Sequence, residues 1–149
     1  MRQFKYIFSL AIVTTFLLIG VISCAGKPLD YYGAVEKVST SATQLTVKEY
    51  TTGAQIILDK GNPEFNTIVD YLEQSVITRD RPRFVENNGD KVEVAIPYVL
   101  NYVLLFTLKG NSEISFDYGN EVWYITEDRI YSASIDAALF ELLNGLFSE

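Results

Sequence analysis

The sequence predicts an α+β domain, in which an antiparallel sheet of six or seven short strands carries two amphipathic helices packed on one face. Several short segments alternate apolar with polar residues and are separated by turn residues, a pattern typical of hairpin-connected strands. Two other segments repeat apolar residues at helical spacing, so each should bury one face. Because most strand segments directly follow one another along the chain, the sheet is expected to be antiparallel.

Length and composition favour a single compact domain. The chain has 149 residues, of which 48% are hydrophobic and 21% charged, and this balance is too apolar for a disordered chain. The formal net charge is −7, and a leader that contains Arg2 and Lys5 leaves 10 of the 12 basic side chains against all 19 acidic ones. Such a domain has no electrostatic attraction to phosphate backbones, so we expect no nucleic-acid partner.

The first expected elements of the domain are three strands. Residues 31–38 are a candidate strand, and residues 44–50 alternate apolar with polar side chains. The Thr51-Thr52-Gly53 turn then leads into residues 54–58, so these last two segments form a predicted hairpin.

A helix is expected after Asn62. Asn62 can cap the helix, Pro63 suits the first helical position, and Glu64 is favourable at a helix N-terminus. The apolar stripe consists of Phe65, Ile68, Val69, Leu72 and Val76. The helix should end before residues 79–83, which are expected to form a loop because Pro82 and the residue before it resist helical geometry.

The rest of the chain predicts a meander that ends in a second helix. After a turn at residues 87–90, apolar residues alternate as far as Pro97, and a central strand follows over residues 98–108. Tight turns then join further strands at residues 112–118, 122–126 and 129–131. Ser134 is the expected N-cap of the second helix, whose apolar face consists of Ile135, Ala138, Leu139, Leu142, Leu143 and Leu146.

The first 24 residues have the layout of a secretion signal. Arg2 and Lys5 form a short positive segment, and an apolar run extends from Ile7 to Ile22. The run closes on Val21-Ile22-Ser23-Cys24, which resembles the lipobox of bacterial lipoproteins. The resemblance implies cleavage before Cys24 and transfer of a diacylglyceryl group to this cysteine, and two acyl chains suffice for a stable membrane anchor.

The anchor predicts the organisation and the location of the protein. Residues 1–23 are the expected signal peptide, residues 24–30 the lipidated cysteine with a short spacer, and residues 31–149 the domain, held at the extracytoplasmic face of the cell membrane. Two alternatives stay open. The leader can remain uncleaved as a transmembrane helix, or Cys24 can be a reactive or disulfide-forming thiol, although the chain contains no second cysteine.

The order of hairpin, helix, meander and helix, together with the lipobox, resembles the YhfM-like lipoprotein domain of Gram-positive bacteria. Two local patterns carry the resemblance: Ala95-Ile96-Pro97-Tyr98 enters a long strand, and Arg129-Ile130-Tyr131-Ser132 precedes a terminal helix with Leu142-Leu143. The resemblance covers residues 54–146 and implies a location and a fold. It implies no activity, cofactor or site residue.

Patterns for catalysis and metal binding are missing from the sequence. It has no histidine, its one cysteine is expected to carry lipid, and it contains no Gly-rich phosphate loop, zinc spacing or calcium loop. We therefore expect no enzymatic activity, metal or cofactor, although Ser–Lys catalysis stays open. Glu127 with Asp128, or Asp117 with Glu121, would suit a hydrolase or a calcium site, but both pairs lie in predicted turns, where acids are favoured for backbone reasons.

Two groups of residues are candidates for contact with a ligand or partner. Arg79, Arg81 and Arg83 form a basic cluster suited to bidentate capture of a carboxylate or phosphate, although neighbouring acids can instead satisfy these charges in a solvated loop. Trp123 and Tyr124 should point to opposite faces of their strand, so one is expected to be exposed. An exposed aromatic can stack on a glycan or anchor a protein, with core packing as the alternative.

Two functional classes are compatible with these features. The leading one is a non-enzymatic lipoprotein domain that binds an envelope protein or modulates an envelope system. The alternative is a lipoprotein that binds a small ligand or cell-wall glycan on the exposed face of the sheet. A protein site should present a flat apolar patch, a glycan site several coplanar exposed aromatics in a groove, and a hydrolase a cleft with two converging acids.

Overall fold

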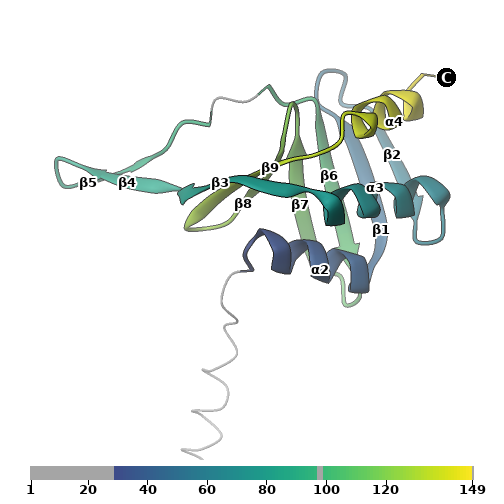
Figure 1. Ribbon diagram of the computed structural model, residues 1–149, viewed down its shortest axis with the longest axis horizontal. Coiled ribbons are helices and arrows are strands. Elements are labelled where there is room, and N and C mark those ends of the chain that lie inside the picture. The colour runs from purple at the N-terminus through teal and green to yellow at the C-terminus, as the bar shows by residue number, and fades with distance from the viewer. Residues whose placement is uncertain (1–28, 97–98, 149) are drawn as a thin grey trace, which may run out of the picture.

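The computed structural model describes residues 29–96 and 99–148, so Cys24 and the expected signal peptide lie outside the described residues. Within these ranges the chain forms three helices, which are α2 (Tyr31–Ser41), α3 (Pro63–Gln74) and α4 (Ala138–Leu146) (Figure 1). The strands are β1 (Ala42–Glu49), β2 (Gln55–Asp59), β3 (Val76–Pro82), β4 (Phe84–Asn87), β5 (Asp90–Glu93), β6 (Tyr102–Leu108), β7 (Glu113–Tyr118), β8 (Val122–Ile125) and β9 (Arg129–Ser134).

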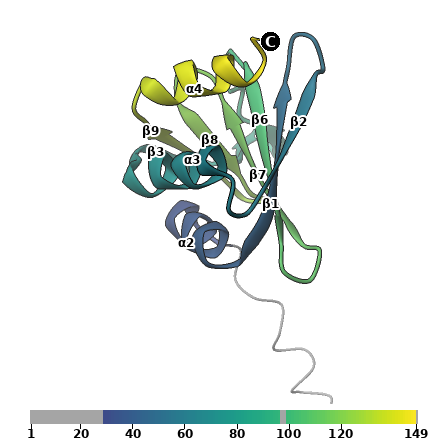
Figure 2. The same cartoon turned by 90° about the vertical axis from the view of Figure 1, so that its right-hand side faces the viewer.

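Seven of these strands form one antiparallel sheet in the order β2-β1-β6-β7-β8-β9-β3. Figure 2 shows α2, α3 and α4 on the same side of this sheet. The other two strands, β4 and β5, pair only with each other and project beyond the end of β3 (Figure 1). The predicted α+β class with an antiparallel sheet is confirmed, but the described residues contain three helices rather than the two expected.

The additional helix, α2, occupies the segment that the sequence predicted as a first strand. Asp30 is its N-cap, since the carboxylate accepts a hydrogen bond from the Gly33 amide at 2.8 Å. The buried side chains recur at helical spacing and are Tyr31, Ala34, Val35 and Val38. The strand prediction was wrong because it assigned Asp30 to the spacer and so overlooked the cap.

The helix after Asn62 is confirmed, whereas the loop expected at residues 79–83 is wrong. The Asn62 side chain accepts a hydrogen bond from the Glu64 amide at 2.8 Å, as predicted. However, α3 ends at Gln74, and Val76, which was placed on the helical stripe, is already the exposed first residue of β3. Strand β3 pairs with β9 through to Pro82, and proline is tolerated there because β3 is an edge strand.

The second helix also begins later than expected. Ser134 pairs with Val76 as the last residue of β9, so it cannot be the helix cap. Instead the Asp136 carboxylate accepts a hydrogen bond from the Ala138 amide at 2.9 Å. The central strand likewise starts later than predicted, at Tyr102, and the expected hairpins of the meander are confirmed.

The core lies between the helices and the inner face of the sheet. Phe106 of β6 and Phe116 of β7 are fully buried at its centre. The ring of Tyr31 packs edge-on against Phe116 with centroids 5.8 Å apart, and Phe65 packs against Phe106 at 6.1 Å. Each helix therefore contributes its apolar face to one shared core, with Leu139 of α4 completing it.

Candidate functional site

The projecting pair of strands forms a defined surface feature, which we call the arm (residues 84–93). Its register is regular, with Phe84 opposite Glu93 and Val85 opposite Val92. The turn at its tip contains Asn88 with φ 53° and Gly89 with φ 88°, the positive values that the tightest hairpin turns require. The turn predicted at residues 87–90 is thus confirmed.

One face of the arm is apolar and exposed. Val85 and Val92 lie directly across from each other, and their exposed fractions are 45% and 42%. On the other face, the Lys91 ammonium lies 4.5 Å from the centroid of the Phe84 ring, and the Arg83 guanidinium lies 5.3 Å from it. These cation–π contacts stiffen a two-stranded ribbon that would be marginal in isolation.

Arg83 holds the base of the arm against the main sheet. Its Nε binds the Glu93 carboxylate at 2.8 Å, and its Nη1 donates to the Thr126 carbonyl at 3.2 Å. Its backbone amide also donates to the Asp128 carbonyl, at 2.7 Å. Arg83 is therefore occupied by contacts within the chain.

The other two arginines of the predicted cluster lie on β3 but do not converge on one site. The Arg79 side chain is exposed and forms no ion pair or hydrogen bond with another described residue, although its backbone lies opposite Ser132 of β9. Arg81 stacks over Trp123, with its guanidinium carbon 6.0 Å from the ring centroid, and its Nη2 donates to the Ala95 carbonyl at 3.4 Å. Its Nε is buried without a hydrogen-bond partner among the described residues.

Trp123 and Tyr124 do lie on opposite faces of β8, but the expected exposed aromatic is wrong. Trp123 faces away from the helices, yet Arg81 lies over it and only 3% of it is exposed. Tyr124 is half-buried among aromatic neighbours on the helix side, 5.3 Å from Phe116 and 6.2 Å from Tyr131 between ring centroids. Desolvation by burial, with smaller contributions from Tyr131 and Asp30, raises the pKa of Tyr124.

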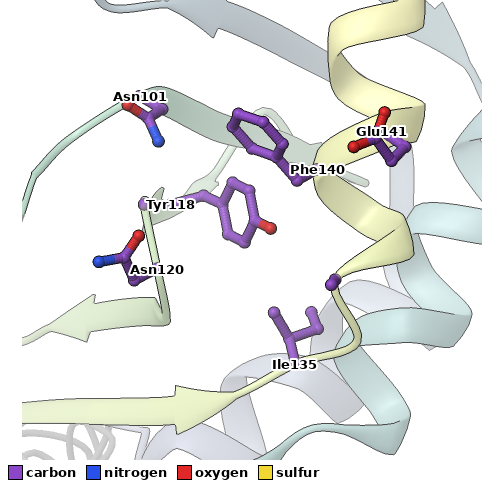
Figure 3. A pocket seen from close by; sticks show the side chains of 8 residues that line it. Asn101, Tyr118, Asn120, Ile135, Phe140 and Glu141 are labelled. Atoms are coloured by element: carbon purple, nitrogen blue, oxygen red, sulfur yellow. The ribbon is translucent and has the colours of Figure 1, made fainter.

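A pocket of about 320 Å³ opens where the sheet meets α4 (Figure 3). Its wall comes from the start of β6, the β7–β8 turn, the segment after β9 and the first turn of α4. The lining residues are Asn101, Tyr118, Gly119, Asn120, Ile135, Ala137, Phe140 and Glu141. Sequence reasoning did not predict this site, because its residues come from three separate stretches that each read as core, turn or helix.

The hydroxyl of Tyr118 points into this pocket, toward the start of α4 (Figure 3). Only 3% of Tyr118 is exposed, and its hydroxyl forms no hydrogen bond with another described residue. Desolvation, with a smaller contribution from Tyr102, raises its pKa, so the hydroxyl stays protonated at neutral pH. The Tyr102 ring stacks on Tyr118 with centroids 6.4 Å apart, and the Tyr102 hydroxyl, by contrast, is satisfied by a hydrogen bond to Asn144.

The two acidic pairs singled out in the sequence lie at the β7–β8 and β8–β9 turns. Glu127 and Asp128 are exposed in the β8–β9 turn, and the Glu121 carboxylate accepts a hydrogen bond from the Thr78 hydroxyl at 2.9 Å. Residues 29–96 and 99–148 contain no group of three potential metal ligands. In the same ranges no helix is both long and apolar enough to cross a membrane.

Comparison with known proteins returned no protein-family model, curated protein or solved structure that matches this chain.

Proposed function

We propose that this protein is a non-enzymatic lipoprotein, anchored through Cys24 at the extracytoplasmic face of the cell membrane, whose domain binds an envelope protein through the arm. The leader and the lipobox-like tetrapeptide support the anchor, and the resemblance to YhfM-like lipoprotein domains supports the same location. The arm carries the binding part of the proposal.

The single observation that favours a protein partner is the exposed face of Val85 and Val92 on a projecting ribbon. Because both valine side chains face solvent, they contribute no buried surface to the core. A small flat apolar face of this kind suits burial against another protein. The other face of the arm is covered by Lys91 and Arg83, so only one face is apolar.

The test is in-cell crosslinking of the full chain, followed by quantification of the captured proteins. Replacing Val85 and Val92 together by threonine keeps the strand preference of both positions and removes the apolar face. Ile57→Ser is the matched control, because Ile57 is equally apolar and 61% exposed but lies on β2 at the opposite edge of the sheet.

We expect one envelope protein at near-equal amounts, captured by the wild type and by Ile57→Ser but lost in the double threonine variant. Equal capture by all three forms would exclude the arm as the binding surface. Cys24→Ala tests the anchor separately: the variant should leave the membrane fraction, and its unchanged retention would refute the lipid attachment.

A further inference from the structure

The pocket beside α4 shares no residue with the arm and contains an unpaired polar group. Tyr118 is almost fully buried, yet its hydroxyl meets no partner among the described residues and faces the cavity. Among the described residues Arg81 Nε is the buried side-chain atom that lacks a hydrogen bond, so the Tyr118 hydroxyl is open to the pocket rather than sealed in the core. An accessible hydroxyl with no protein partner is free to bond to water or to a ligand. This group therefore identifies the pocket as a place where a ligand atom can complete a hydrogen bond.

The polar lining is suited to hydroxyl groups. Asn101 and Asn120 lie on the same side of the opening as the Tyr118 backbone (Figure 3), and each side-chain amide offers both donors and an acceptor. Glu141, in the first turn of α4, adds a carboxylate that accepts hydrogen bonds. A ligand with several hydroxyl groups can pair with all four side chains at once.

The pocket also has an apolar side. The ring of Phe140 and the side chain of Ile135 border the space that the Tyr118 hydroxyl enters (Figure 3). A sugar ring presents hydroxyl groups around its rim and C–H groups on its faces, so it matches a lining that is polar on one side and apolar on the other. The volume of about 320 Å³ lies at the small end of ligand pockets, which suits one ring.

Charge disfavours an anionic ligand. Glu141 is the only charged residue that lines the described pocket, and it is negative. A helix N-terminus can bind anions through its amides, but those of α4 are already occupied: Ala138 donates to the Asp136 carboxylate, and Leu139 and Phe140 donate to backbone carbonyls. The lining therefore disfavours an anionic ligand, and its amide and hydroxyl groups suit a neutral polyhydroxyl ligand.

We infer that this pocket binds a single neutral sugar ring, held by Tyr118, Asn101, Asn120 and Glu141 against Phe140. The ring can belong to a free monosaccharide or to the end of a glycan chain. This site lies beneath α4 rather than on the exposed face of the sheet, and it is independent of the proposed arm contact.

The experiment is saturation-transfer NMR with the full chain in detergent, using glucose, N-acetylglucosamine, a short linear oligomer of N-acetylglucosamine and glucose 6-phosphate as probes at millimolar concentration. We expect at least one neutral sugar to bind and glucose 6-phosphate to bind much more weakly. Tighter binding of the oligomer than of its monomer would assign the ring to a glycan end, and equal or weaker binding would assign it to a free sugar.

Two matched variants test the assigned hydroxyl. Tyr118→Phe should weaken sugar binding by about tenfold without lowering the unfolding temperature, because the hydroxyl makes no internal bond. Tyr102→Phe should lower the unfolding temperature and leave sugar binding unchanged, because Tyr102 loses its hydrogen bond to Asn144 but does not line the pocket. Ala137→Phe, at an exposed lining position, should block the pocket and abolish binding. Absence of binding by every neutral probe, or equal binding by wild type and Tyr118→Phe, would overturn the inference.

Discussion

Tyr31→Phe tests how the first helix is held to the rest of the domain. Tyr31 is fully buried, and its hydroxyl is hydrogen-bonded to the Ser75 hydroxyl at 2.7 Å, at the C-terminus of α3. Ser75 in turn donates to the Leu72 carbonyl, so it keeps one partner when the tyrosine hydroxyl is removed. At neutral pH we expect the variant to lose about 1 kcal/mol of unfolding free energy, the usual net value of one hydrogen bond.

At alkaline pH the difference should change sign. Desolvation by burial raises the pKa of Tyr31 from 10.0 to about 12 in the folded protein, partly offset by the bond to Ser75. The unfolded chain therefore releases this proton first as pH rises, and the stability that Tyr31 contributes is complete below pH 10.0 and falls toward pH 12. A shift of this size corresponds to roughly 2–3 kcal/mol, which exceeds the value of the hydrogen bond.

The assay is urea unfolding of both proteins from neutral pH to pH 12, followed by the fluorescence of Trp123, the single tryptophan of the chain. Lysines and the other tyrosines titrate in both proteins, so the difference between the two curves isolates Tyr31. The wild type should be the more stable protein at neutral pH, and the variant near pH 12. A difference that stays constant across this range would refute the reasoning about burial of the hydroxyl.

Four further substitutions have outcomes that follow from the local surroundings of each residue. Asp30→Ala removes the N-cap of α2 and should cost about 1 kcal/mol in chemical denaturation, and unchanged stability would contradict the cap. Gly119→Ala would place a methyl carbon 1.8 Å from the Val99 carbonyl oxygen and should destabilise by about 1–3 kcal/mol, whereas Gly145→Ala, a helical position with open space around it, should be neutral or stabilising in the same thermal-unfolding assay. Arg83→Ala should speed hydrogen exchange of the arm amides while leaving the core amides protected, and equal exchange in both proteins would show that Arg83 does not hold the arm.

Local sequence signals predicted much of the fold. Alternating apolar residues identified the β1–β2 hairpin and the β7 strand, where Ile114, Phe116 and Tyr118 face inward as expected. The Asn62 cap and its following proline located α3. These signals were sufficient because they act within a few residues, and period and capping need no knowledge of the distant chain.

The candidate sites were far less predictable. The cluster of arginines looked like one basic loop, but β3 pairs with β9 and separates the three side chains. Arg79 faces solvent, Arg81 stacks over Trp123, and Arg83 lies at the base of the arm. Only long-range pairing decides this outcome. The exposure of Trp123 was mispredicted for the same reason, because strand alternation states which face a side chain occupies but not what covers that face.

The sequence by itself determined the α+β class, the order of most elements and the expectation of a lipid anchor, since composition, periodicity and the closing of the apolar run on Cys24 are local properties of the chain. The helix at residues 31–41 also had local signals, its Asp30 cap and its helical spacing, which the sequence prediction overlooked. Tertiary structure alone decided that the arm projects with one apolar face and that Asn101, Tyr118 and Phe140 border one pocket. These features depend on contacts between segments far apart in the sequence. Burial and cavity formation arise only when those segments pack.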